Sequence, residues 1–252
     1  MTRVAVLIPA YNEVGTIRDI AQRVLSVNSW LIVVDNASSD GTAEALAGLP
    51  LTLMRNHENR GKGASLSHGM RHALEQGADA VVTLDGDAQH LPEDIPRLLD
   101  AHARHPNAIV IGARLHDRRG IPLDRYLANR IGNFFVGWAA GRALADSQSG
   151  FRVYPAALLR TLGPCFERAT GFVFESEILI EAARGGAAIV AVPIAAIYEP
   201  RGRRSHFRPV LDFARIGRMV ASKIASRGFD LPGLVRSLRG PETRSRDSLS
   251  GR

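Results

Sequence analysis

The chain has 252 residues, 45% of them hydrophobic, and this size fits one large domain or a domain of about 200 residues with an appendage. A single cysteine, Cys165, excludes an internal disulfide and is typical of a reducing compartment. The net charge of +7 is concentrated in residues 201–252, which hold 13 Lys/Arg against 4 Asp/Glu. This basic C-terminal part predicts an anionic partner.

Membrane-spanning and secretory segments are not expected. The apolar run before Pro9 has only about six residues, which is too short for a signal peptide. No stretch offers 18 uninterrupted apolar residues, so nothing in the sequence predicts a segment that spans a bilayer alone.

Short apolar runs alternate with helical patterns over the first 114 residues. The predicted strands cover residues 3–9, 30–35, 51–55, 78–85 and 108–114. The predicted helices cover residues 12–27, with Asn12 as a candidate cap, 61–77 and 92–104. Such alternation implies right-handed βαβ units, so we predict an α/β fold with a mostly parallel sheet flanked by helices.

The pattern changes after residue 115. Residues 127–145 are apolar and aromatic but interrupted by arginines and glycines, and a strand is expected at 151–154. A core helix is predicted at 171–186, two strand segments broken at Pro193 at 187–200, and an amphipathic helix at 208–227. We therefore expect one α/β domain over residues 1–207, a basic amphipathic helical region over 208–239 and a disordered tail over 240–252.

The stretch VVTLDGDAQHLP places two acids, Asp85 and Asp87, directly after an apolar strand. Two carboxylates this close repel each other unless a cation or hydrogen bonds hold them. Ligands of open α/β sheets collect at the carboxyl edge of the strands, where this pair is expected. On its own, such a pair is better interpreted as a turn with solvated acids than as a ligand site.

Polar residues follow three of the predicted strands, in the motifs IPAYNE, VVDNASSDGT and LDGDAQH. Because parallel strands end at one edge, Tyr11, Glu13, Asp35 and Asp85 are expected to converge there. No G-x-G-x-x-G follows the first strand and no Walker lysine motif is present, which argues against NAD and P-loop chemistry.

The order of these motifs, together with NRGKGAS, GAR and SGFR, resembles the inverting family 2 glycosyltransferases with the Rossmann-like GT-A fold. More narrowly, it resembles the dolichyl-phosphate mannose synthase and polyprenyl-phosphate glycosyltransferase branch. The resemblance covers about residues 3–225. It implies transfer of a sugar from a nucleoside-diphosphate sugar to a membrane polyprenyl phosphate.

The resemblance also implies a donor site. Its metal, Mg²⁺ or Mn²⁺, would be held by Asp85, Asp87 and Gln89, with Asp85 also beside the ribose. The base and ribose pocket would be lined by Pro9, Tyr11, Glu13 and Asp35. Lys62 matches a loop beside the nucleotide, although a lysine at a helix start is a plain alternative. Asn36 and Ala37 stand where the family commonly has a second acid and a glycine, which leaves the nucleobase open.

The basic stretch EPRGRRSHFRP, residues 199–209, resembles the family's loop that closes over the diphosphate. Arg201, Arg204 and Ser205 match by type, whereas His206 stands where a lysine is usual. An unperturbed histidine is largely neutral at pH 7, so the arginines are expected to carry the charge there. A solvated surface loop is the alternative.

The acceptor of this branch is a lipid phosphate, which is already an oxyanion and needs positive charge more than a base. Arg114, Arg125 and Asn129 match the positions expected to grip it, and Asp87, Arg114 and Arg125 are the predicted catalytic residues. The stretch DSQSGFR carries Asp146 but no Glu-Asp dyad, which favours a phosphate. Asp146 keeps a hydroxylated lipid or saccharide acceptor open, although a structural role in a turn is preferred for it.

A polyprenyl acceptor lies in the bilayer, so we expect peripheral association with the cytoplasmic face of a membrane. Phe134, Phe135, Val136 and Trp138 are candidates for insertion into the interface. The basic helix at 208–227 is a candidate for anionic headgroups. The alternative is that both segments pack on the sheet.

Two readings of other classes remain. A haloacid-dehalogenase-type phosphatase also uses D-x-D, but after its first strand and with a later lysine and acidic pair, whereas here the motif follows the fourth strand. A non-catalytic module that binds nucleotide sugars or anionic polymers would leave the acids without a role. No nucleic-acid motif is present, so nucleic acid is not an expected partner.

Overall fold

The structure is a computed structural model that describes residues 2–114, 123–167, 171, 173–195, 197, 209–226 and 228–238. The strands within these residues are β1 (Val4–Ala10), β2 (Leu31–Asp35), β3 (Thr52–Arg55), β4 (Ala80–Thr83), β5 (Ile109–Ala113), β6 (Arg152–Pro155) and β7 (Ile189–Pro193). The first helices are α1 (Ile17–Val27), α2 (Lys62–Glu75), α3 (Ile95–Arg104) and α4 (Leu123–Ala140). They are followed by α5 (Ala156–Thr161), α6 (Gly163–Glu167), α7 (Val173–Arg184), α8 (Pro209–Ala225) and α9 (Leu231–Leu238). Short 3-10 helices cover η1 (Glu44–Leu46) and η2 (Pro92–Asp94).

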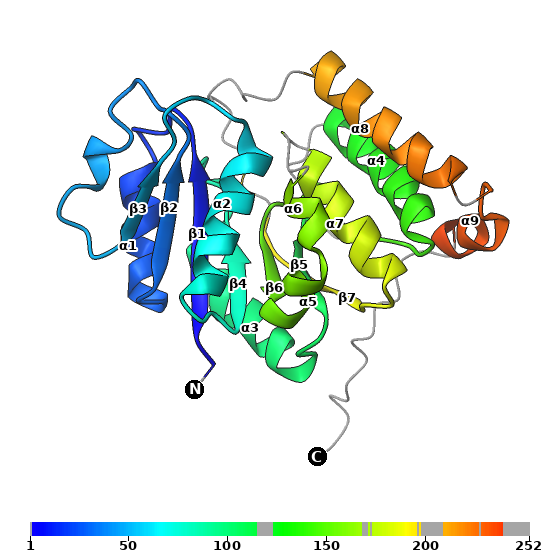
Figure 1. Cartoon of the computed structure of the whole chain (residues 1–252), viewed down its shortest axis with the longest axis horizontal. Coiled ribbons are helices and arrows are strands. Elements are labelled where there is room, and N and C mark those ends of the chain that lie inside the picture. Colours follow the sequence, from blue (N-terminus) through cyan, green and yellow to red (C-terminus); the bar gives the residue numbers. More distant parts are fainter. Residues whose placement is uncertain are drawn as a thin grey trace.

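The strands form one sheet in the order β3-β2-β1-β4-β6-β5-β7 (Figure 1). All pairs are parallel except those of β6, which runs antiparallel to both β4 and β5. The predicted α/β class with a mostly parallel sheet is therefore confirmed. The sequence did not predict that β6 enters the sheet between two strands that precede it in the chain.

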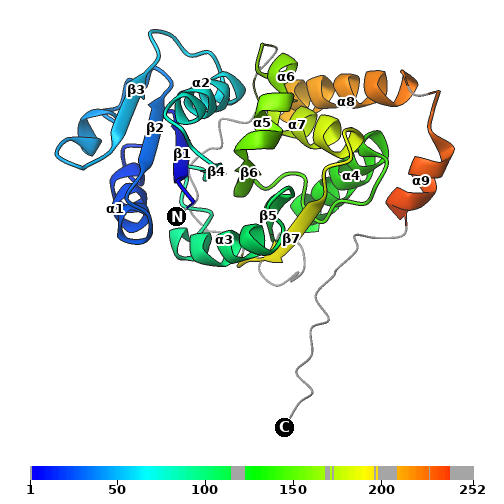
Figure 2. The ribbon, with the colours of Figure 1, turned by 60° about the horizontal axis from the view of Figure 1, so that its bottom comes forward.

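Alternate residues of the inner strands supply two separate cores, one on each face of the sheet. In β1, Ala5 and Leu7 belong to one apolar cluster, and Val6 and Ile8 belong to the other. Figure 2 shows α1 and α3 on one side of the sheet and α2 and α7 on the other. A strand buried on both faces must be apolar throughout, which explains the continuous apolar runs of the sequence.

The start of α1 differs from the prediction. The helix begins at Ile17 with Thr16 as its N-cap residue, so the expectation that Asn12 caps it is wrong. Asn12 instead has a φ of 54°, and its side chain accepts a hydrogen bond from the Ser39 N–H at 2.9 Å. Because the Asn12 side-chain oxygen is bonded to the turn that contains Ser39, it does not cap the helix.

The C-terminal helices lie against the rest of the molecule. Helix α8 packs on α4 and α7, and its residues Ile216, Val220 and Ile224 are buried in the core cluster (Figure 1). The predicted amphipathic helix at 208–227 is confirmed, with its apolar face directed into the protein. In the second expected strand segment after Pro193, residues 194–195 and 197 are not in a strand. The tail at 240–252 lies outside the described residues.

No helix in the described parts of the chain combines the length and the hydropathy that crossing a bilayer requires.

Candidate functional site

The loops that follow β1, β2 and β4 leave the sheet at the same edge. Strand pairing places Ala10 opposite Asp35, where β1 and β2 end together, and Leu7 opposite Thr83, where β4 ends three residues earlier in the register. Hydrogen bonds then join the loops: Glu13 N–H donates to Thr42 Oγ1 at 2.7 Å, and Thr16 Oγ1 donates to the Gly86 carbonyl at 2.7 Å. The structure thus brings together the loops that carry Tyr11, Glu13, Asp35 and Asp85, as the sequence predicts.

These same three loops hold left-handed residues that are not glycine. Asn12, Ala37 and Ala88 have φ values of 54°, 61° and 63°. The left-handed region costs a residue with a Cβ about 1–2 kcal/mol, and such strain gathers at functional sites. Ala37 stands where the resemblance implies a glycine, and its positive φ is a conformation that glycine favours.

Replacing Ala37 by glycine is expected to raise the free energy of unfolding by about 1 kcal/mol, because glycine adopts a positive φ without strain. Ala43 offers a matched control, since its φ of −67° is helical and Ala43→Gly is expected to destabilise. Chemical denaturation of both variants measures the difference. A destabilised Ala37→Gly protein would contradict the strained turn.

Asp35 is buried at the end of β2, with an exposed fraction of 0%. Its carboxylate accepts hydrogen bonds from the Ser38 N–H and from Arg55 Nε, both at 3.1 Å. Burial and these bonds give Asp35 a role in fixing the turn at residues 36–38. A contact with solvent or ligand would require that turn to open.

Asn36 connects this turn to the segment before α2. Its side-chain oxygen accepts from Asn56 Nδ2 at 2.9 Å and from the Arg60 N–H at 3.0 Å, and its amide nitrogen donates to Asn59 Oδ1 at 2.8 Å. An amide can donate and accept at once, which a carboxylate cannot. Asn36 therefore positions the loop that leads to Lys62.

Lys62 lies between two carboxylates. Its Nζ is 2.7 Å from Asp85 Oδ1 and 2.8 Å from Glu175 Oε2. Burial acts to lower the pKa of Lys62, but the charges of Asp85 and Glu175 outweigh it and hold the pKa above its usual range. Lys62 is therefore an ammonium ion at neutral pH. Glu175, in the first turn of α7, was missed because residues 171–186 read as a core helix; a glutamate within that apolar pattern is the only signal the sequence gives.

Asp85 and Asp87 form the predicted acidic pair. Burial acts to raise the pKa of Asp85, but Lys62 and other nearby positive charges lower it overall. Desolvation of the carboxyl, and then the charge of Asp85, raise the pKa of Asp87 to about 6, although the residue as a whole is exposed. A cation between the two groups would relieve this repulsion, so the pair fits a divalent metal.

The remaining ligand predicted for the metal is Gln89, which is half-buried and whose N–H donates to Asp87 Oδ1 at 3.1 Å. Within the described ranges, no three His, Cys, Asp or Glu side chains gather into a metal-binding group. A metal here would thus rest on two carboxylates, an amide and oxygens from the donor or water, as Mg²⁺ accepts.

Gly150, in the SGFR motif, lies against Asp85. A Cβ at this position would come within 2.5 Å of Asp85 Oδ2, so a side chain there would displace the carboxylate. Arg152 of the same motif is fully buried and donates to the carbonyls of Ser147 and Glu175, each at 2.8 Å. This motif therefore supports the loop and the start of α7 from beneath the site.

Arg114 and Asp146 form a buried ion pair at the end of β5. Arg114 Nε lies 3.0 Å from Asp146 Oδ2, and the Arg114 N–H donates to the same oxygen at 3.1 Å. Asp146 has an exposed fraction of 0% and Arg114 of 8%. Asp146 also accepts from the Gln148 N–H at 3.2 Å, which is the turn role that the sequence favours for it.

Asn133 ties α4 to the loop that holds Asp146. Its Oδ1 accepts from the Ser147 N–H at 2.7 Å, and its Nδ2 donates to the Ala145 carbonyl at 3.0 Å. Sequence reasoning missed this residue, since an asparagine in an apolar helix has no pattern of its own.

Several predicted residues are not placed by the structure. Arg201, Arg204 and His206 lie outside the described residues, as does the side chain of Arg125, whose backbone belongs to α4. Asn129 is half-buried on α4, and Pro9 and Tyr11 are half-buried at the end of β1 and just after it.

His90 ends the acidic motif and is 2% exposed. Its ring packs on Phe151, with ring centroids 5.4 Å apart. Burial lowers the pKa of His90 to about 4, so the ring is neutral at pH 7. It acts as part of the core beneath the site.

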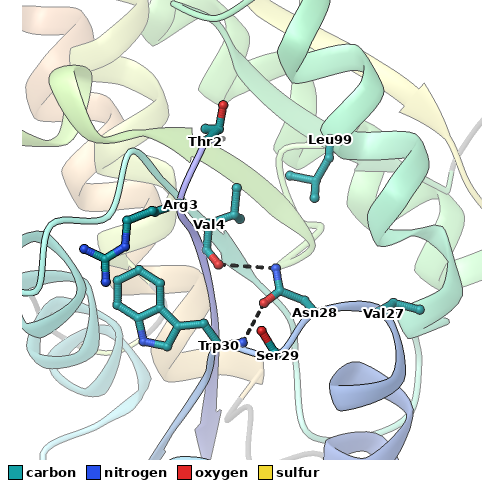
Figure 3. Close-up of a pocket in the computed structure, with 8 residues that line it drawn as sticks. All are labelled: Thr2, Arg3, Val4, Val27, Asn28, Ser29, Trp30 and Leu99. Carbon is teal, nitrogen blue, oxygen red and sulfur yellow. Dashed lines mark hydrogen bonds between the residues drawn. The ribbon is translucent and has the colours of Figure 1, made fainter.

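A hollow of about 630 Å³ opens at the amino ends of β1 and β2, at the opposite edge of the sheet from Asp85 (Figure 3). It is lined by Thr2, Arg3, Val4, Val27, Asn28, Ser29, Trp30 and Leu99. None of the predicted donor or acceptor residues lies there.

A family comparison identifies the chain. Residues 5–162 match the sequence model of the family described as Glycosyl transferase family 2. The chain belongs to glycosyltransferase family 2. It is therefore a glycosyltransferase, which confirms the resemblance drawn from the motifs and removes the phosphatase alternative.

Its relatives include enzymes named for polyprenyl phosphates. A UDP-N-acetylglucosamine–dolichyl-phosphate N-acetylglucosaminyltransferase of Methanococcus voltae is 29% identical, covering 76% of this chain and 84% of that protein. An undecaprenyl-phosphate mannosyltransferase of Micrococcus luteus is 31% identical, covering 76% of this chain and 82% of that protein.

The fold recurs in a solved glycosyltransferase. The crystal structure of glucosyl-3-phosphoglycerate synthase from Mycobacterium tuberculosis, in complex with Mn²⁺, UDP and phosphoglyceric acid, superimposes with a TM-score of 0.66. The match covers 90% of this chain and 78% of that one, at 21% identity. It confirms the predicted GT-A fold.

Proposed function

We propose that this family 2 enzyme transfers a sugar, with inversion, from a nucleoside-diphosphate sugar to a polyprenyl (dolichyl-type) phosphate, with Mg²⁺ or Mn²⁺, at the cytoplasmic face of a membrane. The names of the Methanococcus and Micrococcus relatives support the acceptor class. The Mn²⁺ and UDP bound to the structural neighbour support the donor class and the metal.

The donor would lie at the carboxyl edge of β1, β2 and β4. Asp85, Asp87 and Gln89 would hold the metal, which would neutralise the diphosphate and stabilise it as a leaving group. Pro9, Tyr11 and Glu13 would line the nucleoside pocket. Asp35 would act on that pocket by fixing the turn after β2, and Arg201, Arg204 and His206 would close over the diphosphate.

The burial of Asp146 is the observation that carries the acceptor class. A general base must reach the proton that it removes, but this carboxylate is 0% exposed and is bonded to Arg114. A phosphate acceptor needs no base, because its oxygen arrives deprotonated.

In the proposed reaction a phosphate oxygen attacks the anomeric carbon from the face opposite the diphosphate. The new C–O bond forms as the old one breaks, and the bonding electrons leave with the nucleoside diphosphate. Arg114, Arg125 and Asn129 would position the acceptor phosphate, since a planar guanidinium suits its oxygens.

The direct test is a panel of nucleotide sugars, each incubated with the protein, Mg²⁺ or Mn²⁺ and a polyprenyl phosphate, with mass spectrometry of the lipid product. One donor of the panel is expected to yield a glycosylated polyprenyl phosphate, and chelation of the metal is expected to stop the reaction. Donor binding without any product would favour the binding-module alternative.

The surface proposed for the membrane differs from the one that the sequence suggested. Val136 is only 1% exposed, so this candidate is wrong. Trp138 is half-buried, and its Nε1 donates to the Asp230 carbonyl at 3.3 Å. Among the side chains of α4 that the structure describes, the exposed apolar ones are Leu127, Ile131 and Phe135, at 49%, 58% and 43%. Their spacing of four places them along one side of the helix.

Helix α9, which packs against α4, also exposes apolar residues. Leu231, Val235 and Leu238 are 66%, 48% and 67% exposed. Arg215 and Arg218 are exposed on α8, which also packs against α4. Exposed apolar and basic residues on α4 and the two helices packed against it suit the interface of an anionic membrane, where each arginine contributes about 1 kcal/mol of screened attraction.

The protein is accordingly expected to sediment with anionic liposomes at low salt and to be released at high salt, because ions screen the attraction. Ile131→Asp is expected to weaken sedimentation. Leu53→Asp, at a 40% exposed position on β3, is the control that is expected to leave it unchanged. Equal sedimentation with neutral and anionic liposomes would show that apolar insertion dominates over charge.

A further inference from the structure

Lys62 forms an ion pair with Asp85, the same carboxylate that would bind the metal. Lys62 Nζ lies 2.7 Å from Asp85 Oδ1, and Gly150 packs against that carboxylate as well. A divalent cation that approaches Asp85 would therefore meet the Lys62 ammonium, which is already paired with this carboxylate. Two cations within a few ångströms of one oxygen repel each other, so they compete for Asp85.

Glu175 offers Lys62 a second anion within reach. Its Oε2 lies 2.8 Å from the same Nζ, so Lys62 can loosen its bond to Asp85 and remain paired. The lysine side chain is 18% exposed and that of Glu175 is 10% exposed, which makes an unpaired ammonium costly here.

Glu175 is held firmly enough to act in this way. Its carbonyl accepts from Arg152 Nη1 at 2.8 Å, and Arg152 also donates to Tyr154 Oη at 3.0 Å in the buried core. Glu175 lies in the first turn of α7, where the helix dipole favours a carboxylate.

We propose that Lys62 is an internal counter-ion that competes with the divalent cation for Asp85. In this proposal Glu175 is a positioning residue, which keeps the Lys62 ammonium paired when the cation binds to Asp85. This inference rests on the metal-dependent function proposed above. A diphosphate entering the site gives Lys62 a further anionic partner and so removes a competitor of the metal. Metal and donor therefore bind cooperatively, each raising the affinity for the other by the same factor.

The test is a titration of the protein with Mn²⁺ alone, followed by electron paramagnetic resonance of the free ion, and a second titration with UDP or GDP present. In Lys62→Met, Mn²⁺ is expected to bind about tenfold more tightly without nucleotide, and the nucleotide is expected to enhance binding less. Lys62→Arg keeps the charge and is expected to bind Mn²⁺ as weakly as the wild type.

Glu175→Gln is expected to weaken Mn²⁺ binding without nucleotide, because the ammonium then rests on Asp85 and one negative charge is lost. It is expected to leave metal-free binding of the nucleoside diphosphate intact or stronger, whereas a merely structural defect would weaken both. Lys223 provides a matched control. Its Nζ lies 3.2 Å from Glu177 Oε1 and 2.6 Å from Glu181 Oε1, so its ion pairs are made with α7 and not with Asp85. Lys223→Met is expected to leave Mn²⁺ affinity unchanged.

Equal or weaker Mn²⁺ binding by a folded Lys62→Met protein would overturn the competition. If Asp87→Asn abolishes Mn²⁺ binding while the Lys62 and Glu175 variants leave it unchanged, the metal site stands and only this inference fails. If the wild type binds no Mn²⁺ even with UDP or GDP, the metal-dependent function fails together with the inference.

Discussion

Replacing Asp87 by asparagine is expected to reduce sugar transfer by about 10³-fold, because it removes a charged metal ligand that stabilises the leaving diphosphate. The fold is expected to remain intact, since Asp87 is exposed and asparagine retains an oxygen for the Gln89 N–H. The measurements are turnover at saturating donor and the thermal unfolding midpoint.

Asp79 provides the control for this variant. It precedes the amino end of β4, opposite the end that leads to Asp87, and accepts a hydrogen bond from the Arg3 N–H at 2.8 Å. Asp79→Asn removes the same charge from the other edge of the sheet and is expected to leave transfer unchanged. Near-normal turnover of Asp87→Asn would remove Asp87 from the metal site.

Arg125→Ala is expected to reduce transfer by about 10²-fold while sparing donor affinity, because a charge-assisted hydrogen bond to the acceptor phosphate contributes about 1.5–3 kcal/mol. Arg130, an exposed arginine of the same helix whose Nη1 lies 3.2 Å from Tyr126 Oη, is the matched control. Arg130→Ala is expected to retain transfer. Donor affinity by calorimetry and turnover with polyprenyl phosphate are measured for both.

Asp146→Asn separates the two acceptor classes when it is compared with Arg125→Ala. Loss of one member of a buried ion pair costs about 3–5 kcal/mol, so this variant is expected to unfold more easily. Asparagine retains an oxygen that can accept from Arg114, so turnover per folded molecule is expected to stay nearly unchanged, whereas loss of a general base would cost about 10²–10⁴-fold. An inactive but folded Asp146→Asn beside an active Arg125→Ala would indicate a hydroxyl acceptor.

The sequence predicted β1, β2, β4 and β5 well because these strands are buried on both faces and read as apolar runs. The order of the strands in the sheet was harder to predict from the sequence. Strand β6 is short, and only its long-range pairing with β4 and β5 makes it antiparallel and central. The start of α1 was misplaced because Asn12 has the composition of a cap but bonds Ser39 in three dimensions.

The site was predicted where residues follow strand ends, as Asp85 and Asp87 do, because parallel strands deliver their ends to one edge. Glu175 and Asn133 escaped prediction since each lies in a helix with an apolar pattern, and their roles arise from partners in distant segments. The outward side of α4 was misjudged at Val136, because a helix that packs on α7, α8 and α9 leaves only a narrow stripe exposed.

The acceptor class is tested most directly by offering the protein two lipids of equal chain length, a polyprenyl phosphate and the corresponding free polyprenol. Each is incubated with Mg²⁺ and the active nucleotide sugar, and the lipid product is identified by mass spectrometry. The account predicts a glycosylated polyprenyl phosphate and no product from the alcohol. Transfer to the free polyprenol, or to neither lipid, would contradict it.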